Sequence, residues 1–422
     1  MRVLLVSPQF PRDFSRSVYG GFQRLRMWLE AIQSLEADVE ILFFPSAGVA
    51  VGSEAAAAVA QGLLEAWGVR AEVTLCEREP EEQRRGRLAR YVAAYVRPAL
   101  GPSHHTLFRP YRGKRQQEAM ARCLARSPDI VFFHQLQSAS PAMSLSLDSA
   151  RVFLDLDDVE PRRFAREVGQ PPHWRLKPLL YLQVPALWWG GRGAIVRTDR
   201  TFVCSEADRH YLRRTMAVRN VVVVPNAVPR IADRALATNP NVLFLGAYSH
   251  PPNVAAAEFL VREVWPRLAR ICPRARLLIA GPRSEAIPSF QDPPRGVEFL
   301  GFVSDLARLY RTTRVVCCPI QSGSGTRIKI LEAASYGVPV VATPLAAEGI
   351  DLVPEREILL RRDPGALAQA CADLIVDDVR ASRVGTAARE RVRDLYTRDA
   401  VVQRMAAILA DRTAVRSGAG VR

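Results

Sequence analysis

The stretch from Val315 to Leu352 reads VVCCPIQSGSGTRIKILEAASYGVPVVATPLAAEGIDL. It opens with an apolar run, Val315–Pro319, which leads into a Gly-rich loop, Gln321–Arg327. A helical pattern then begins at Thr326–Arg327, and a second apolar run follows at Val338–Ala342. Strand, Gly-rich turn, helix and strand succeed one another in this way in parallel α/β units. The stretch therefore predicts a parallel sheet covered by helices.

Similar short apolar runs recur along the whole chain and are separated by helical patterns. Their apolar residues fall on both faces, as in buried parallel strands. In the first half they are Arg2–Ser7, Val39–Phe44, Ile130–His134, Arg151–Asp155, Thr201–Ser205 and Asn220–Val224. In the second half they are Asn241–Gly246, Ala275–Ala280, Val297–Leu300 and the two runs quoted above. We predict an α/β protein with two Rossmann-like, doubly wound parallel sheets.

The boundary between the two sheets is expected in the segment PNAVPRIADRALATNP at residues 225–240, which lacks periodicity and carries three prolines. We predict an N-terminal domain over residues 1–228 and a C-terminal domain over residues 229–390. Residues 391–422 are expected to form a C-terminal helix that packs back on the N-terminal domain, followed by a tail.

Composition and charge narrow the class of protein. The chain has 422 residues, of which 48% are hydrophobic and 24% charged, enough for two substantial cores. The net charge of +15 favours acidic partners such as nucleotide phosphates or anionic lipid headgroups. Only Lys114, Lys177 and Lys329 are lysines; the other basic residues are arginines. No basic motif is interleaved with aromatic residues, so nucleic acid is not an expected partner.

The cysteines and the N-terminus indicate a cytoplasmic protein. The seven cysteines form no Cys-x-x-Cys pair, which argues against a disulfide framework and against structural zinc. The first residues, MRVLLVSPQF, are interrupted by Pro and Arg too early for a signal peptide.

An apolar segment, Pro178–Gly191, leaves two interpretations open. Its length of about 14 residues is short of the roughly 20 that span a bilayer. The favoured interpretation is a buried helix packed between the domains. The other is an acceptor-facing or membrane-surface segment with Trp188 and Trp189 at the headgroup boundary. Together with the net charge, the second makes peripheral association with the anionic inner membrane a hypothesis to test.

The Gly-rich loop has the chemistry of an anion site. Gly323 and Gly325 let backbone N–H groups point at one ligand, and the helix N-terminus adds partial positive charge. Arg327 and Lys329 add full charges, although two residues apart on a helix they would not both face one ligand. Glu332 lies one turn beyond Lys329, where an ion pair on the helix surface is the simplest expectation.

At this point the sequence resembles a known family. The stretch is similar to the donor-binding signature of the retaining GT-B glycosyltransferases of family 4, the "glycosyl transferases group 1". The subgroup pattern is Pro, Gly-x-Gly-Thr-Arg-x-Lys-x-x-Glu-Ala, then Gly-x-Pro-Val-Val-Ala-Thr and Glu-Gly. The matching residues are Pro319, Gly323, Gly325, Thr326, Arg327, Lys329, Glu332, Ala333, Gly337, Pro339, Val340, Val341, Ala342, Thr343, Glu348 and Gly349.

Weaker similarities to the same family extend through most of the chain. They lie at Ser7–Pro8 with Gly20–Gly21, Asp129–His134, Val224–Ala227, Leu243–Gly246 with His250–Asn253, and Gly301–Asp305.

The resemblance implies a fold and an activity. The fold would be GT-B, with two Rossmann-like domains facing across a cleft. The enzyme would transfer a sugar from a UDP- or GDP-linked donor to a glycan or lipid-linked acceptor, with retention of configuration. The subgroup is closest to enzymes of polysaccharide and exopolysaccharide biosynthesis. No metal and no other cofactor would be essential.

The resemblance also implies roles for individual residues. Arg327 and Lys329 would neutralise the donor diphosphate, and Glu332 would accept hydrogen bonds from the ribose hydroxyls. His134 would sit beside the transferred sugar, although a structural role for this histidine is equally open. The other implied donor-binding residues are Gly20, Gly21, Gly246, Val303, Gly323, Ser324, Gly325 and Thr326.

Some features depart from the family or allow other functions. Ser324 stands where many members carry the first carboxylate of a Glu-x7-Glu pair. The acidic run Asp155–Asp158 resembles the Asp-x-Asp metal signature of the GT-A fold, but we favour an acceptor-side cluster of Asp157, Asp158 and Glu160 without metal.

Two other functions stay open at this point. One is a nucleotide-sugar epimerase that enlists His134, Asp157 and Glu348. The other is a catalytically silent sugar-nucleotide-binding subunit, motivated by Ser324.

Overall fold

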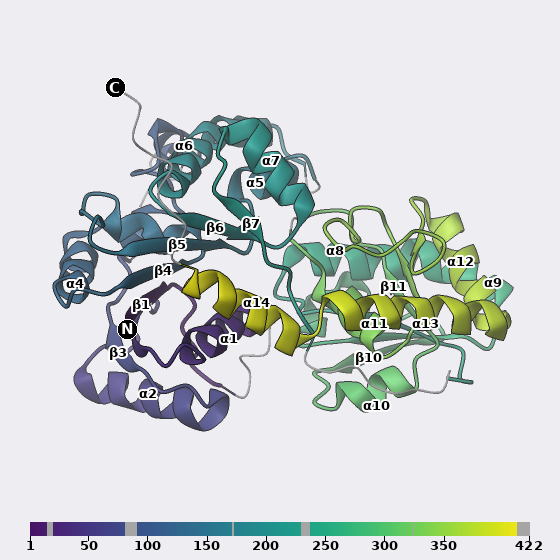
Figure 1. The fold of residues 1–422 in the computed structure, drawn as a ribbon. Helices are drawn as coiled ribbons and strands as arrows, with labels where there is room; N and C mark the ends of the chain where they lie inside the picture. The colour runs from purple at the N-terminus through teal and green to yellow at the C-terminus, as the bar shows by residue number, and fades with distance from the viewer. Residues whose placement is uncertain (15–19, 81–90, 171–172, 229–236, 324, 412–422) are drawn as a thin grey trace. The chain divides into compact units, whose positions relative to one another are not determined.

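The computed structural model describes the chain except for residues 15–19, 81–90, 171–172, 229–236, 324 and 412–422 (Figure 1). It divides into two compact units, and each is described by itself below. The first comprises Met1–Pro225 with Val402–Arg422, and the second comprises Asn226–Val401. Among the described residues, no helix is long and apolar enough to cross a membrane.

The first unit is built on a seven-stranded parallel sheet in the order β3-β2-β1-β4-β5-β6-β7. The strands are β1 (Arg2–Ser7), β2 (Asp38–Phe43), β3 (Glu72–Leu75), β4 (Ile130–His134), β5 (Arg151–Leu156), β6 (Arg200–Val203) and β7 (Val221–Val223). The strand order reverses between β1 and β4, which pair with Val6 beside Phe133. Ser7 and His134 therefore leave the sheet together at its switch point, where open α/β sheets bind ligands.

Helices cover this sheet (Figure 1). The longer ones are α1 (Gly20–Gln33), α2 (Ser53–Trp67), α4 (Lys114–Leu124), α5 (Glu160–Val168), α6 (Val184–Ile195) and α7 (Glu206–Met216). Short helical turns are η1 (Val92–Val96), η2 (Arg97–Leu100), η3 (Arg109–Tyr111), η4 (Leu136–Ala142) and η5 (Lys177–Gln183). The fully buried Trp28 ring of α1 lies 4.6 Å from the rings of both Phe132 and Phe202, which fastens α1 to one sheet face.

The second unit has a six-stranded parallel sheet in the order β10-β9-β8-β11-β12-β13. Its strands are β8 (Asn241–Leu245), β9 (Arg276–Ala280), β10 (Val297–Gly301), β11 (Val315–Cys318), β12 (Val340–Ala342) and β13 (Leu359–Leu360). The order reverses between β8 and β11, so the loops after these two strands leave the sheet side by side.

The helices of the second unit and the chain's last helix complete the fold. They are α8 (Pro251–Phe259), η6 (Leu260–Val264), α9 (Trp265–Ile271), η7 (Ser284–Ala286), η8 (Pro288–Phe290), α10 (Leu306–Arg311), α11 (Ile328–Ser335), α12 (Pro364–Val376), α13 (Asp378–Leu395) and α14 (Arg398–Ala410). Beyond α14, the Asp411 carboxylate of the first unit pairs with Arg200 at 2.7 Å.

The predicted architecture of two doubly wound parallel sheets is confirmed, and each predicted apolar run overlaps a strand. The two strands that were not predicted, β3 and β13, are edge strands. β3 is mostly half-exposed, with the sequence EVTL, and β13 has only two residues. An edge strand buries less apolar surface, so its sequence lacks the continuous apolar run that marks a central one.

Two local expectations need correction. The helix expected to start at Thr326–Arg327 begins at Ile328, because Arg327 has the non-helical torsions φ −87° and ψ 89°. The apolar segment Pro178–Gly191 is not buried throughout: the Leu182 side chain is 59% exposed and that of Trp189 61% exposed.

A glycine in the second unit provides a test of this packing. Gly281 has φ +134°, and a Cβ there would lie 1.7 Å from the backbone oxygen of Gly246. We expect Gly281→Ala to lower the free energy of unfolding by more than about 3 kcal/mol, because strain and collision add. Urea unfolding, with hydrogen exchange of β8 and β9 peptides, measures the loss.

The matched control is Gly301→Ala. Gly301 also has positive φ, +61°, but a Cβ there meets nothing within 4 Å. Its substitution should cost only the torsional strain of about 1–2 kcal/mol. Equal losses for both variants would contradict the collision with Gly246.

Candidate active site

The Gly-rich loop of the second unit follows β11 and is wrapped around the Arg327 side chain. Gly323 has φ +96° and Gly325 φ +75°, a region that favours glycine. The Arg327 guanidinium donates to the backbone oxygens of Ser322, at 3.3 Å, and Gly325. A Cβ on Gly323 would lie 3.2 Å from that guanidinium. The predicted donor-binding residue Ser324 lies outside the described residues.

Arg327 precedes α11 rather than belonging to it. Two residues on one helix, two positions apart, would not face one ligand, but Arg327 has non-helical torsions and this restriction does not apply to it and Lys329. The Arg327 charge is near enough to Lys329 to contribute to a lowered pKa of the ammonium. The two cations thus lie in one neighbourhood at the carboxyl end of β11.

Lys329 is half-buried and has unusual partners for a lysine. Its Nζ donates to Asn253 Oδ1 at 2.9 Å and lies 4.5 Å from the centroid of the Phe244 ring. Burial lowers the pKa of Lys329 to about 8, with a further contribution from Arg327, while Cys318 and Glu332 oppose the shift. The site therefore holds a desolvated cation at a neutral amide and a π face.

Asn253 is held in place by the loop after β8. Its Nδ2 donates to the backbone oxygen of Ala247 at 2.9 Å. A Cβ on Gly246 would lie 3.0 Å from Asn253 Cγ, so the absent side chain of this predicted site residue makes room for the amide. Asn253 was not predicted as a site residue. The sequence signal for this residue is the family-like segment His250–Asn253, which by itself does not show that Asn253 contacts Lys329.

Glu332 lies on α11 and is bound to a buried tyrosine. The Tyr310 hydroxyl donates to Glu332 Oε2 at 3.5 Å, and the Tyr310 ring stacks on Tyr336 with centroids 4.8 Å apart. Burial raises the pKa of Glu332, opposed by Lys329 and by the tyrosine. The expected ion pair on the helix surface is wrong, since within the described chain Lys329 is bonded to Asn253 instead.

The remaining predicted donor-side residues have clear positions. Thr326 Oγ1 accepts from Asn226 Nδ2 at 2.6 Å, which ties the Gly-rich loop to the residue after Pro225. Val303 is half-buried against the core of the second unit. It follows Phe302, whose side chain is 56% exposed.

In the first unit, His134 ends β4 and is fully buried. Its Nδ1 lies 3.0 Å from Ser7 Oγ, while its Nε2 is buried without a hydrogen-bond partner among the described residues. Burial lowers the pKa of His134 to about 4; Asp155 opposes the shift and Arg24 adds to it. The imidazole is therefore neutral at pH 7.

Gly20 and Gly21 begin α1. A Cβ on Gly21 would lie 2.1 Å from the Gln9 side chain, whose Oε1 is buried without a partner in the described structure. Because Gly21 has no side chain, Gln9 in the loop after β1 can pack against the start of α1.

An ion pair with no exposed surface lies behind His134. Arg24 donates to both oxygens of Asp155, at 2.7 and 2.5 Å, and to the backbone oxygen of Val224 at 3.0 Å. Burial alone would lower the pKa of Arg24, but Asp155, together with Cys204 and Asp157, outweighs burial and the pKa is raised. This pair joins α1, β5 and the segment after β7.

The predicted acceptor-side carboxylates follow β5 and differ in environment. Burial and the neighbouring Asp158 raise the pKa of Asp157 to about 7, and Cys204 donates weakly to Asp157. Glu160 accepts two hydrogen bonds from Arg163, at 3.1 and 2.6 Å. Its carboxylate already has a cationic partner, so Asp157 is the better placed of the two to exchange a proton near neutral pH.

Comparison with known proteins identifies the family of one domain. Residues 239–377 match the family model of the Glycosyl transferases group 1, so the second unit contains a domain of that group. A search of curated proteins finds no match.

Solved structures align with nearly the whole chain. Sucrose-phosphate synthase from Thermosynechococcus elongatus has a TM-score of 0.68 at 16% identity, covering 97% of this chain and 98% of that one. Anabaena HepE, in complex with UDP and glucose, has 0.64 at 14% identity, covering 97% and 100%. S. aureus TarM, in complex with UDP and α-GlcNAc-glycerol among other ligands, has 0.66 at 10%, with the same coverage. The predicted GT-B fold is confirmed.

The desolvated cation provides a prediction about stability. Below pH 8 the folded chain holds a charged, half-buried Lys329, so Lys329→Met should be more stable than the wild type at pH 7. Between pH 8 and the ordinary value of 10.5, the unfolded wild type binds more protons than the folded one. Its stability therefore rises with pH, and the difference should shrink. Thermal unfolding at pH 7 and pH 9.5 measures this.

Lys114→Met is the matched control. The Lys114 side chain is 91% exposed, so its removal should change stability by less than about 0.5 kcal/mol at both pH values. A Lys329→Met variant that is less stable than the wild type at pH 7 would contradict the description of Lys329 as a cation whose burial lowers stability.

Proposed function

We propose that this chain is a retaining, family 4-type glycosyltransferase of polysaccharide or exopolysaccharide biosynthesis. It transfers a sugar from a UDP- or GDP-linked donor to a glycan or lipid-linked acceptor, in the cytoplasm, without an essential metal or other cofactor. The observation that carries the proposal is the pairing of Arg327 and Lys329 beside a glycine loop with positive φ, in a domain of the group 1 transferases.

The chemistry follows from charge. When the sugar–phosphate bond breaks, negative charge develops on the leaving nucleotide diphosphate, and preorganised cations stabilise that charge. Lys329 has no carboxylate within ion-pair distance in the described chain, and its charge is therefore left for the phosphates. A bound diphosphate raises the pKa of Lys329 above its value of about 8 in the free protein, so binding favours the ammonium.

The other roles follow the same pattern. Glu332, anchored by Tyr310, accepts hydrogen bonds from the ribose hydroxyls. In the first unit, neutral His134 lies beside the transferred sugar, and Asp157 is the group of the acceptor-side cluster that exchanges a proton near pH 7. UDP is the first donor nucleotide to try, since the similar folds of HepE and TarM were solved with UDP.

Activity measurements test the proposal. Lys329→Ala and Glu332→Ala should each lower turnover by roughly 10²–10³-fold, the usual cost of losing one preorganised charge or hydrogen-bonding group. A thermal-shift screen of UDP, GDP and ADP first identifies the nucleotide, because a tight ligand raises apparent stability by mass action. Release of that nucleotide from its sugar in the presence of an acceptor then gives the rate.

Controls separate this from other functions. Lys114→Ala should keep full activity. Near-wild-type turnover in both site variants, with a donor that binds, would refute the assignment. Conversion of the donor to an isomer without acceptor would instead indicate an epimerase.

Asn253 gives a sharper test of the cation. In Asn253→Asp a carboxylate replaces the amide 2.9 Å from Lys329 Nζ, so the pKa of the lysine should rise and nucleotide affinity should fall at pH 7. Loss of affinity above pH 8 in the wild type should move to higher pH in this variant. Asn253→Ala should weaken binding without that upward shift. Identical pH profiles of nucleotide affinity in the wild type and Asn253→Asp would contradict the role of Asn253.

A further inference from the structure

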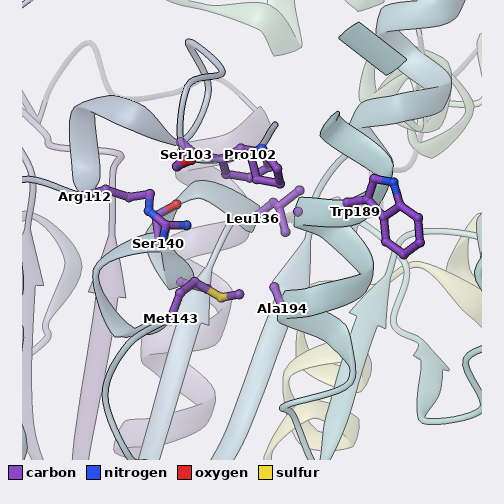
Figure 2. A pocket seen from close by; sticks show the side chains of 11 residues that line it. Pro102, Ser103, Arg112, Leu136, Ser140, Met143, Trp189 and Ala194 are labelled. Carbon is purple, nitrogen blue, oxygen red and sulfur yellow. The ribbon is translucent and has the colours of Figure 1, made fainter. Parts of the chain in front are cut away.

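The first unit contains a cavity of about 250 Å³ that none of the predicted donor-binding or acceptor-side cluster residues line, although Trp189 of the predicted apolar segment does (Figure 2). Most of its wall is apolar and comes from segments distant in sequence. These lining residues are Pro102, Phe108, Leu136, Ala139, Met143, Trp189, Gly190 and Ala194. A Cβ on Gly190 would lie 2.6 Å from the Phe108 ring, so the bare backbone of α6 forms part of the wall.

One side of the cavity is polar and lacks partners. The Ser140 side chain is buried, and its Oγ makes no hydrogen bond with any described residue. Arg112 is half-buried and, within the described chain, its guanidinium has neither an ion pair nor a hydrogen bond. In Figure 2 the Arg112 side chain extends toward Ser140 from the side opposite Trp189. A buried hydroxyl and an unpaired cation in one cavity favour an anionic group.

The surface beside the cavity is apolar. Trp189 lines the cavity, and in Figure 2 its ring is turned away from the other labelled side chains. Elements η1, η2, η5 and α6 pack against one another, and they expose large apolar side chains to solvent. These are Val96, Leu100, Tyr181, Leu182 and Trp189, each more than 40% exposed. Such a patch beside a cavity marks a binding surface rather than ordinary exposure.

We propose that this cavity binds the phosphate end of a phosphorylated single-chain lipid. The phosphate contacts Arg112 and Ser140, the first part of the hydrocarbon chain fills the apolar wall, and the rest lies along the exposed patch. The cavity is large enough for only part of such a lipid, since sites that enclose whole ligands usually measure about 300–1,000 Å³. The apolar patch favours a lipid phosphate over a soluble anion, because a soluble anion has no hydrocarbon surface to bury against the patch.

The identification of this lipid as the acceptor's carrier rests on the proposed transferase function, but its binding does not. In that case the lipid-linked alternative, rather than a free glycan, is the acceptor class. Of the two tryptophans in the predicted membrane-surface segment, only Trp189 takes part in this site. Trp188 donates to the Thr215 backbone oxygen and packs against the core, whereas Trp189 lies at the cavity.

Calorimetric titration of the full chain tests the cavity with three probes: decyl phosphate below its micelle concentration, inorganic phosphate, and decyltrimethylammonium. We expect decyl phosphate to bind at least ten-fold more tightly than either of the others, because only it offers both the charge and the chain. Equal affinity for inorganic phosphate would overturn the need for a lipid. Equal affinity for the cationic amphiphile would overturn the role of Arg112.

Variants locate the binding. Arg112→Gln should weaken decyl phosphate at least ten-fold, whereas Arg122→Gln on α4, with the same charge change at an exposed arginine outside this cavity, should not. Ala194→Leu fills the apolar wall and should weaken binding likewise. If Ala194→Leu does not fold, Arg112→Gln still decides, since no described residue depends on its charge. Equal effects of Arg112→Gln and Arg122→Gln would refute the site.

Nucleotide binding separates this proposal from the transferase function. Arg112→Gln should bind the nucleotide found in the thermal-shift screen as tightly as the wild type. Nucleotide binding without selective binding of decyl phosphate would refute the lipid site alone. Lipid binding without nucleotide binding would leave this site standing and refute the transferase.

Discussion

A half-buried ammonium without a carboxylate partner is the feature on which the second unit's site depends. Burying a cation costs free energy, and an anionic neighbour usually offsets the cost. Lys329 has an amide oxygen and an aromatic face instead. Lys329 is therefore without an ion-pair partner in the described chain at the start of α11, where Arg327 adds a second positive charge. Gly246 makes room for the Asn253 amide that accepts from Lys329, and the backbone of the glycine loop accepts from Arg327.

In the first unit, the ends of parallel strands likewise bring polar side chains together, but here the buried charge is neutralised by an ion pair. Three buried strands, β1, β4 and β5, bring Ser7, His134 and Asp155 to one edge, where unpaired charge would be costly. Arg24 neutralises Asp155 with a bidentate contact. Burial, assisted by the Arg24 charge, keeps the histidine neutral; it is hydrogen-bonded at one nitrogen and without a partner at the other in the described chain. A buried nitrogen of this kind is a group that a ligand or water can satisfy.

The sequence predicts these features unevenly, and the reasons are physical. Central strands are buried on both faces, so their apolar runs were sufficient to locate β1, β4, β8 and β11. The glycine loop was predictable because positive φ demands glycine. The partner of Lys329 was not predictable. Asn253 lies 76 residues earlier in the chain, and its uncharged amide is not recognisable from the sequence as the partner of a lysine. Likewise the Arg163 contact that engages Glu160 looks in sequence like any exposed helix pair.

The cavity in the first unit shows where positive charge is available to a ligand, which the amino-acid composition alone does not reveal. The net charge of +15 and two adjacent tryptophans suggest association with an anionic membrane surface, but neither says where on the molecule the positive charge is available. Many described arginines, among them Arg163, Arg200 and Arg314, already have carboxylate partners. Arg112 differs because the chain brings it beside a buried hydroxyl and an apolar wall without an acidic residue among the lining side chains. The useful positive charge is thus one that folding leaves unpaired, and the same reasoning identifies Lys329 in the second unit.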